Sequence, residues 1–211
     1  MEAGVILVAA GEGRRFGGPK AFADLAGKSL LEWAAAPFAS FRDRVAVLRR
    51  EDLPRARLPG WKTVAGGPRR RDSVANGLAS LDPSTPLVLI HDAARPLASA
   101  ALVERVLAAA ARHPAVVPAI PLVDTVKRVR GDVVVETLDR ASLVAVQTPQ
   151  AFRTDILRRA LRDPRDATDE AALVEGLGEP VVTVAGDRLN VKITTGEDLD
   201  LVRVLLQAGM R

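Results

Sequence analysis

A glycine-rich loop at residues 11–20 contains the first residues of the chain that could do chemistry. It reads Gly-Glu-Gly-Arg-Arg-Phe-Gly-Gly-Pro-Lys and directly follows a run of apolar residues. Glycines let backbone N–H groups approach phosphate oxygens closely, and Arg14, Arg15 and Lys20 add fixed positive charge. The loop could instead be a surface turn with solvated arginines, but its place after an apolar run favours a binding site for a polyanion.

Neither of the two common phosphate-binding motifs matches this loop. A dinucleotide fingerprint needs two residues between its second and third glycines, whereas three residues separate Gly13 from Gly17. The spacing of a P-loop is present, but a proline stands before Lys20 and Ala21 offers no hydroxyl for a magnesium ion. The loop is therefore predicted to hold its polyanion in a different type of site.

A second glycine turn, Gly66-Gly67, precedes a helix that can begin near Asp72. The turn could approach a nucleotide closely. Glycine followed by a cap residue suits a plain strand-to-helix turn equally well, with Asp72 or Ser73 as the N-cap. Both interpretations stay open on the residues alone.

Asp92 follows the apolar run 87–90 at a place where α/β proteins bind ligands. Its carboxylate could bind a ribose hydroxyl or a magnesium ion, or it could stabilise a turn with Arg95 as its local partner. His91 and His113 are the only histidines and are too few for a His-based metal site.

The residue types that are missing narrow the reaction. The chain has no Cys, and it contains neither a G-x-S-x-G nor an H-E-x-x-H motif, so covalent acyl transfer and zinc hydrolysis lack their residues. A phosphate monoester is largely dianionic at pH 7 and can attack another phosphorus without a general base. Catalysis then requires neutralising and aligning two anions, which Arg15, Lys20, Arg140, Lys192 and a magnesium ion could do.

The composition is that of an ordinary globular protein. Of the 211 residues, 48% are hydrophobic and 27% are charged, which excludes a disordered or low-complexity chain. The net charge is only +4, although the pI is about 10.1. The pI is high because the chain has no Tyr or Cys, so almost nothing titrates between neutral pH and pH 10. Aromatic residues that could stack on bases are few, and the arginines at 69–71 are expected to be solvated, so no nucleic-acid partner is predicted.

The alternative from a different class is a nucleotide-sensing or nucleic-acid module without turnover, whose nucleic-acid affinity would fall steeply with salt. The early apolar run at residues 4–10 is too short to span a bilayer and has its arginines behind it. We therefore expect a soluble cytoplasmic protein with no membrane partner.

The apolar pattern predicts an α/β fold with a doubly wound, mostly parallel sheet. Continuous apolar runs, typical of strands covered on both faces, alternate with helical patterns. The expected strands are 4–10, 44–48, 86–90 and 115–120, and the expected helices are 29–41 with Ser29 as N-cap, 72–81 and 99–112. Ligands bind beyond the carboxyl ends of such strands, so the glycine-rich loop and residues 91–96 should face one crevice.

The second half of the chain is predicted to begin with an unusual insertion. The β-branched segments 123–129 and 133–138 are joined through Arg130-Gly131-Asp132, a hairpin signal, and could form an arm for a second subunit. The remaining elements are expected to be an apolar strand up to Thr148, helices from Thr154 and at 168–176, strands at 180–185 and 190–194, and a final helix opened by Thr195-x-x-Asp198.

Taken in order, the motifs resemble the 2-C-methyl-D-erythritol 4-phosphate cytidylyltransferases over nearly the whole chain. The opening loop alone marks only the wider sugar nucleotidyltransferase superfamily, whereas the other segments are more specific. They are Leu7-Val-Ala-Ala-Gly-Glu-Gly-Arg-Arg15 with Pro19-Lys20, Gly66-Gly67 with Arg70 and Asp72-Ser-Val-x-x-Gly77, His91-Asp-Ala-Ala-Arg-Pro96, Val123-Asp-Thr-Val-Lys127, Arg140 with Gln147-Thr-Pro-Gln-x-Phe152, Thr168-Asp-Glu-Ala171, and Asn190-Val-Lys-Ile-Thr194.

The resemblance implies a Rossmann-like nucleotidyltransferase fold with an extended β-hairpin arm. It implies a single domain over residues 1–211, within which residues 123–148 form the β-arm and dimerisation region. The implied activity is transfer of a cytidylyl group from CTP, with Mg²⁺, to 2-C-methyl-D-erythritol 4-phosphate in non-mevalonate isoprenoid synthesis. Relatives share the nucleotide half of the site, so another polyol phosphate such as ribitol 5-phosphate is the alternative acceptor.

The resemblance also implies roles for individual residues. Arg15, Lys20, Arg140 and Lys192 would be catalytic. The nucleotide would be held by Ala9, Ala10, Gly11, Gly13, Gly67, Ser73, Asp92 and Ala93, with Asp92 also a candidate for the metal. The acceptor would be held by Arg95, Thr125, Arg140, Thr148, Thr168 and Lys192, and in a homodimer Thr125 and Arg140 would serve the neighbour's site. Taken singly, Lys192 could equally be a snorkelling lysine and Thr168 a plain N-cap. Thr148 could mark only a strand end, and Thr125 and Arg140 could be exposed positions on a hairpin.

Overall fold

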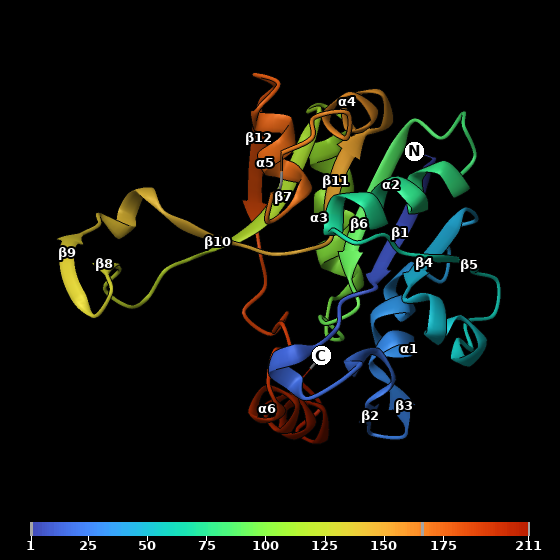
Figure 1. Ribbon diagram of the computed structural model, residues 1–211, viewed down its shortest axis with the longest axis horizontal. Helices are drawn as coiled ribbons and strands as arrows, with labels where there is room; N and C mark the ends of the chain where they lie inside the picture. Colours follow the sequence, from blue (N-terminus) through green and yellow to red (C-terminus); the bar gives the residue numbers. More distant parts are fainter. Residues whose placement is uncertain (1, 166, 211) are drawn as a thin grey trace.

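The computed structural model of the chain, which describes residues 2–165 and 167–210, is built on a central mixed sheet (Figure 1). The strand order is β10-β7-β11-β6-β1-β4-β5, with β12 also paired to β7. The strands are β1 (Ala3–Ala9), β4 (Arg44–Leu48), β5 (Lys62–Ala65), β6 (Leu87–Asp92), β7 (Ala115–Pro121), β10 (Val144–Val146), β11 (Gln150–Arg153) and β12 (Val181–Ala185). The expected strands at 4–10, 44–48, 86–90, 115–120 and 180–185 are confirmed within one or two residues.

Four neighbouring parallel strands end at the same level of the sheet. β1 runs parallel to β4 and β6, and β4 runs parallel to β5. In this register Ala9 pairs with Leu48, Leu48 with Ala65, and Val8 with Asp92. The loops that follow these four strands therefore start side by side, as expected for a ligand crevice in a doubly wound sheet.

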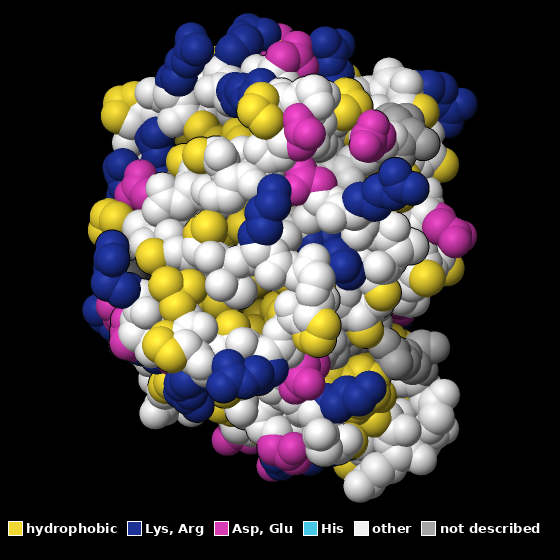
Figure 2. All heavy atoms as spheres, turned by 90° about the vertical axis from the view of Figure 1, so that its right-hand side faces the viewer, with side chains coloured by type: hydrophobic (Ala, Val, Ile, Leu, Met, Phe, Trp, Pro, Cys, Tyr) yellow, Lys and Arg dark blue, Asp and Glu magenta, His cyan; other side chains and the backbone are white. Residues whose placement is uncertain are grey.

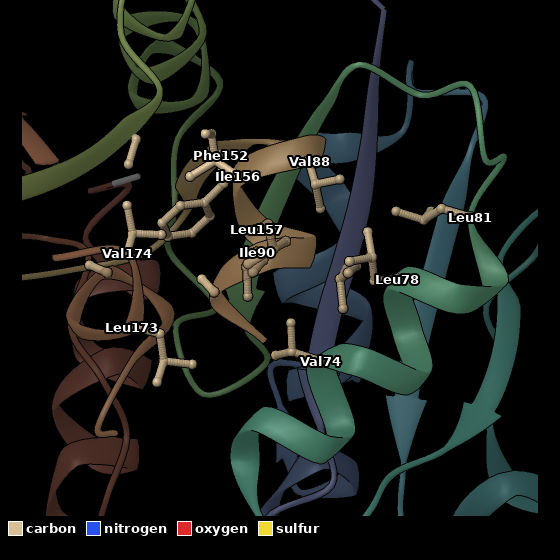
Figure 3. Packing of buried hydrophobic residues seen from close by; sticks show 14 of the residues in the cluster. Val74, Leu78, Leu81, Val88, Ile90, Phe152, Ile156, Leu157, Leu173 and Val174 are labelled. Atoms are coloured by element: carbon tan, nitrogen blue, oxygen red, sulfur yellow. The ribbon is translucent and has the colours of Figure 1, made fainter. Parts of the chain in front are cut away.

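The central strands are buried on both faces, which explains their continuous apolar sequences. In β1, Ile6 packs among residues of α2, α4 and α5, whereas Val5 and Leu7 pack on the opposite face with α3 and α1. Figure 3 shows the first of these cores, in which side chains from α2, α4 and α5 gather around Val88, Ile90 and Phe152. The sheet is a rigid support for the loops at its carboxyl edge.

Four of the six described α-helices begin after a residue whose side chain caps them. The six helices are α1 (Leu30–Ala35), α2 (Arg70–Ser80), α3 (Ala100–Ala110), α4 (Thr154–Ala160), α5 (Glu170–Glu175) and α6 (Gly196–Gln207). Ser29 caps α1 and Thr195 caps α6, each in a capping box, which confirms both predicted starts. α1 is shorter than the expected 29–41 because Pro37 cannot donate a backbone hydrogen bond, and the chain continues as a 3₁₀ turn, Ala36–Phe38.

The prediction of a strand at 190–194 is wrong. These described residues run between β12 and α6 without strand pairing, and their contacts to the rest of the fold include the bond from Ile193 N to Ala94 O. The alternating apolar residues Val191 and Ile193 instead pack in the small core that includes α6. The antiparallel strand β11, which separates β6 from β7, was not predicted because its four residues show no clear alternation.

The predicted hairpin is confirmed as β8 (Lys127–Arg130) paired with β9 (Val133–Thr137). Arg130 pairs with Val133, so Gly131 and Asp132 form the two-residue turn, and Gly131 has a φ of 58° that favours glycine. The hairpin projects away from the central sheet (Figure 1), and every residue of both strands is exposed. In the described part of the chain, no helix combines the length and apolarity needed to cross a membrane.

Candidate active site

A cavity of about 970 Å³ lies at the carboxyl ends of the four parallel strands. Its wall comes from the segments that follow β1, β4, β5 and β6, together with the first turn of α2 and one residue from the segment before α6. The lining residues are Val8–Arg14, Lys20, Ala21, Arg49–Glu51, Gly66–Arg70, Ser73, Asp92–Ala94 and Lys192. The two residue-rich loops that the sequence predicted to face one crevice do so.

Glycine is required at two places in this wall. Gly13 has a φ of 65°, and a Cβ there would collide with the carbonyl of Gly18, where the glycine-rich loop folds back on itself. Gly66 packs against Ala10, and a Cβ at Gly66 would lie 2.5 Å from the Cβ of Ala10 and 2.8 Å from Ser73 Oγ. The second glycine turn therefore packs directly against the residue that precedes the glycine-rich loop, and both line the same cavity.

Asp92 is the central charge of the cavity. Its Oδ1 pairs with Arg70 Nη1 at 2.7 Å and its Oδ2 pairs with Lys192 Nζ at 2.7 Å. Burial by itself would raise the pKa of Asp92, but the charges and hydrogen bonds of Arg70 and Lys192 hold the pKa well below its usual range. Asp92 is thus ionised at neutral pH. Arg95, its candidate partner from sequence, donates its guanidinium bonds to the carbonyls of Asn190 and Val146 instead.

Arg70 links Asp92 to a second buried carboxylate. Its Nη2 lies 3.1 Å from Glu170 Oε2 at the start of α5, and Glu170 is only 1% exposed. Burial raises the pKa of the Glu170 carboxyl, opposed by the charge of Arg70. The expectation that the arginines at 69–71 are solvated is wrong for Arg70 and Arg71, whose side chains are 23% and 12% exposed.

Lys20, at the end of the glycine-rich loop, is held beside the segment that carries Lys192. Its Nζ donates a hydrogen bond to the carbonyl of Ile193 at 2.7 Å, next to Lys192. Burial lowers the pKa of Lys20, and the nearby charge of Lys192 lowers it further. Two lysines held together in a partly desolvated cavity repel each other, so a bound polyanion relieves that repulsion.

The structure gathers ten of the predicted site residues in this cavity. They are Ala9, Ala10, Gly11, Gly13, Lys20, Gly67, Ser73, Asp92, Ala93 and Lys192. Ser73 Oγ accepts a hydrogen bond from the backbone N–H of Gly67 at 3.1 Å, so Ser73 fixes the second glycine turn. The predicted N-cap at Asp72 or Ser73 is wrong, because α2 begins at Arg70 with Arg69 as its N-cap. Asp72, at the third helical position, accepts a hydrogen bond from the backbone N–H of Arg69.

The other predicted residues lie outside the set that lines the cavity. Arg15 is exposed in the glycine-rich loop, and Thr168 is exposed before α5. Arg95 and Thr148 are buried behind Asp92, at 9% and 5% exposure. Thr125 and Arg140 are exposed at the base of the β8–β9 arm, and an Arg140 Nη1–H donates to the carbonyl of Val123.

Sequence reasoning assigned no site role to Arg70 or Glu170. Both residues occur only within motifs that carry the family resemblance, and Glu170 is the kind of residue usually placed in a first helical turn for its charge alone. A signal was present, because arginines at the start of α2 oppose the helix dipole and must be offset by anions. Their partner Glu170 could not be found this way, since it lies 100 positions away in the chain.

The cavity suits a metal ion that arrives on a polyanion rather than one held by the protein alone. The described residues contain no group of three His, Cys, Asp or Glu side chains that could hold a metal. Mg²⁺ commonly uses one or two carboxylates together with substrate phosphates. Asp92 provides one ionised carboxylate in the cavity wall, and its partner Lys192 has a side chain that is 43% exposed and can move aside.

Basic side chains do not form a single stripe on the face seen from the side of β5. Figure 2 shows Lys and Arg side chains spread over this face, with Asp and Glu side chains between them. Pairs of opposite charge occur along β4, β5 and their loops, among them Arg49 with Asp52 at 2.6 Å and Lys62 with Asp43 at 3.1 Å. Much of this basic charge is therefore neutralised locally.

Comparison with known proteins identifies the family of the chain. The family model described as 2-C-methyl-D-erythritol 4-phosphate cytidylyltransferase matches residues 3–208. The enzyme of that name from Thermus thermophilus is 43% identical over 97% of both chains. A bifunctional enzyme IspD/IspF from Solidesulfovibrio magneticus is 45% identical over 94% of the chain, which spans only 56% of that protein's length. The chain thus spans about half of the bifunctional relatives and nearly all of the Thermus enzyme.

Solved structures give the same result. The crystal structure of 2-C-methyl-D-erythritol 4-phosphate cytidylyltransferase from Thermus thermophilus has a TM-score of 0.83 and 39% identity, covering 96% of this chain and 98% of that one. The 4-diphosphocytidyl-2C-methyl-D-erythritol synthase of Anaerococcus prevotii has a TM-score of 0.85 and 30% identity, with 98% of each chain covered.

Proposed function

Because the chain belongs to the 2-C-methyl-D-erythritol 4-phosphate cytidylyltransferase family, we propose that it transfers a cytidylyl group from CTP to 2-C-methyl-D-erythritol 4-phosphate. The products are 4-diphosphocytidyl-2-C-methyl-D-erythritol and pyrophosphate, in non-mevalonate isoprenoid precursor synthesis. The observation that carries this proposal is the convergence of Lys20, Lys192 and Asp92 with two glycine turns in one cavity at the strand ends.

The reaction needs no general base from the protein. An oxygen of the acceptor phosphate attacks the α-phosphorus of CTP, the bond from that phosphorus to the bridging oxygen breaks, and pyrophosphate leaves with the electron pair. The acceptor is largely dianionic at pH 7, so no proton has to be removed first. The main barrier is repulsion between two anions, and positioned cations lower it most when water is partly excluded.

Lys20 and Lys192 are suited to this task. Lys20 Nζ is held beside the segment that carries Lys192, and both residues line the same cavity. We assign Lys20, with Arg15 from the glycine-rich loop, to the charge that develops on the α-phosphate. Lys192 would bind the acceptor phosphate, and Arg95, Thr148 and Thr168 would lie around the same acceptor.

The nucleotide would occupy the glycine-lined half of the cavity. The backbones of residues 9–13 and Gly67, which Ser73 fixes, would face the base and the triphosphate, while Asp92 and Ala93 would face the ribose. A magnesium ion bound with CTP would supply charge neutralisation on the phosphates, with Asp92 as its protein carboxylate. Cytoplasmic location stays a prediction.

The remaining predicted groups would come from a second subunit. Thr125 and Arg140 lie at the base of an arm that is exposed along both strands. We propose a homodimer in which the region 123–148 of one chain delivers these two side chains to the acceptor half of the other chain's cavity. The exposed valines of the arm give this contact its apolar area.

Pyrophosphate release measures the proposed activity directly. Purified protein is incubated with CTP and magnesium and with 2-C-methyl-D-erythritol 4-phosphate, ribitol 5-phosphate or no acceptor. We expect release with the methylerythritol phosphate alone and its loss when EDTA removes the metal. Release with ribitol 5-phosphate alone would reassign the acceptor, and silence with both acceptors in protein that binds CTP would refute the proposed transfer.

A further inference from the structure

Four buried residues behind the cavity form a closed cycle of hydrogen bonds. Arg95 Nη1 donates to the carbonyl of Asn190 at 2.8 Å, and Asn190 Nδ2 donates to the carbonyl of Thr148 at 2.8 Å. Thr148 Oγ1 lies 3.0 Å from His91 Nδ1, and His91 Nε2 lies 3.1 Å from the carbonyl of Arg95. The exposed fractions are 0% for His91 and Asn190, 5% for Thr148 and 9% for Arg95.

Donor and acceptor roles in this cycle are fixed by chemistry. A carbonyl oxygen only accepts, so His91 Nε2 must carry the hydrogen that reaches Arg95 O. The imidazole is fully buried and its nitrogens face a carbonyl and a hydroxyl, so it is neutral and Nδ1 accepts from the hydroxyl of Thr148. The same hydroxyl oxygen accepts a hydrogen bond from the backbone N–H of Asp92 at 3.0 Å. The Thr148 hydroxyl thus uses its hydrogen toward His91 and one lone pair toward Asp92.

The cycle joins the paired strands β6 and β11 to a third described segment that has no strand pairing. His91 lies at the end of β6, Thr148 lies between β10 and β11, and Asn190 belongs to the segment where a strand was expected and none forms. Without a ladder, the position of this last segment depends on separate bonds such as those to Asn190. Lys192 lies two residues further on and reaches Asp92, the residue after His91.

We propose that His91 and Asn190 are positioning residues of the proposed transfer, because the cycle fixes Asp92 on the nucleotide side in register with Lys192 on the acceptor side. This inference rests on the proposed function for its kinetic consequences. In this cycle the hydroxyl of Thr148 is already hydrogen-bonded on both sides, to the backbone N–H of Asp92 and to Nδ1 of His91. Phe38 packs against the imidazole in a tilted arrangement, with ring centroids 5.2 Å apart and an angle of 54° between the rings.

Breaking the cycle at two distant links tests whether it acts as a unit. His91→Leu removes both imidazole contacts, and Asn190→Leu removes the donor to Thr148. We expect each variant to lower kcat by about 10- to 100-fold, since small misplacements of reacting groups cost that much, while the KM for CTP changes less than about fivefold. The double variant should lose no more than the larger single loss, because residues of one unit are not additive.

A matched control separates positioning from stability. Thr85 is also buried and donates to Asp43, but it lies before β6, at the other end of that strand from the cavity. Thr85→Val should lower the melting temperature about as much as Asn190→Leu and keep the kcat of the wild type. The proposal would be overturned if the wild type, Thr85→Val and Asn190→Leu had equal kcat. It would also be overturned if the losses of His91→Leu and Asn190→Leu multiplied in the protein that carries both. His91→Gln, which keeps a donor toward Arg95 O, should recover part of the kcat.

A spectroscopic measurement needs no turnover. The chain has two histidines, so ¹⁵N spectra of the imidazoles at pH 7 are simple to assign with a His113→Gln variant. His91 should show a protonated Nε2 and a bare Nδ1, and Asn190→Leu should shift the resonances of His91 but not those of His113. A protonated Nδ1 in His91 would refute the cycle. If the wild type fails to use the acceptor, the proposed function fails, and this spectrum still decides on the cycle.

Discussion

The cavity and the β8–β9 arm differ in how well their side chains are partnered: charged groups in the cavity wall are paired, whereas apolar groups on the arm are exposed. In the cavity wall, both carboxylate oxygens of Asp92 have cationic partners, and Arg70 is shared with the buried Glu170. On the arm, Val133 and Val129 are 66% and 58% exposed and every residue of the two strands faces solvent. Within one chain, the charged side chains around Asp92 are paired, whereas the valines of the arm are uncovered.

This difference separates what one chain can do from what two chains are needed for. A two-stranded hairpin alone is marginally stable in water, and valines in such a place indicate a surface that another molecule covers. The cavity contains the groups that we propose to bind the nucleotide and two lysines, so binding of CTP should need only one chain. Transfer to the acceptor should need the arm of a second chain.

The largest expected effect is on the cavity side. Lys20→Ala removes an ammonium group that lines the cavity and should lower kcat by roughly 10²-fold or more, as loss of one transition-state donor does. Lys28→Ala is the control, because that lysine lies over the ring of Trp33 away from the cavity lining. Steady-state pyrophosphate release measures both. A Lys20→Ala protein with the kcat of the wild type would remove Lys20 from this role.

The arm is tested by mixing two inactive chains. Arg140→Ala should also abolish most activity, and co-refolding it with Lys20→Ala chains should create heterodimers in which one cavity has a normal Lys20 and receives a normal Arg140. We expect such heterodimers, separated by two affinity tags, to recover about half of the wild-type activity per dimer, because one of two sites is intact. Verified heterodimers that stay as inactive as either parent would show that the arm does not serve the other chain.

Those parts of the fold that depend on neighbouring residues could be predicted from the sequence. The apolar run that becomes β1, the cap at Ser29, the capping box at Thr195 and the turn at Gly131 each need only a few adjacent residues to be recognised. The position of the glycine-rich loop in the cavity wall could be predicted in the same way, because glycines and basic residues directly after an apolar run are a local pattern.

Contacts between distant segments could not be predicted. Arg70 and Glu170 are 100 positions apart, and Thr148 and His91 are 57 apart, so no spacing rule connects them. The strand expected around Lys192 failed for a related reason. Alternating apolar residues indicate a strand only where a sheet edge is free to pair, and here Val191 and Ile193 pack beside α6 instead.

A third prediction concerns the buried imidazole behind the cavity. Burial lowers the pKa of His91 to about 4. The charge of Asp92 and the hydrogen bond to the backbone of Arg95 oppose this shift, and the charges of Arg95 and Arg70 add to it. The unfolded chain, with an ordinary pKa of about 6.5, binds a proton first as the pH falls, so this residue contributes stability that is lost between about pH 6.5 and 4. From pH 7 to pH 5 the loss should be about 2 kcal/mol.

Urea unfolding at the two pH values measures this loss, with His91→Gln as the comparison. The variant lacks the titrating group and should lose about 2 kcal/mol less over the same interval. Asp92, whose pKa lies below its usual range, does not interfere, because its contribution is lost only below about pH 4. An identical pH dependence in the two proteins would contradict a neutral, buried His91.

The smallest effect is expected on the arm, where exposure makes a valine nearly irrelevant to the stability of a single chain. Val134 is 55% exposed, so Val134→Ala should change the free energy of unfolding by less than about 0.5 kcal/mol at nanomolar protein. Val88→Ala, at a position with 0% exposure, should cost about 2 kcal/mol at any concentration. If a second chain covers the arm, the cost of Val134→Ala must grow with protein concentration, because dimerisation then contributes to stability. A cost that stays the same from nanomolar to micromolar protein would mean that the valines of the arm remain exposed in solution.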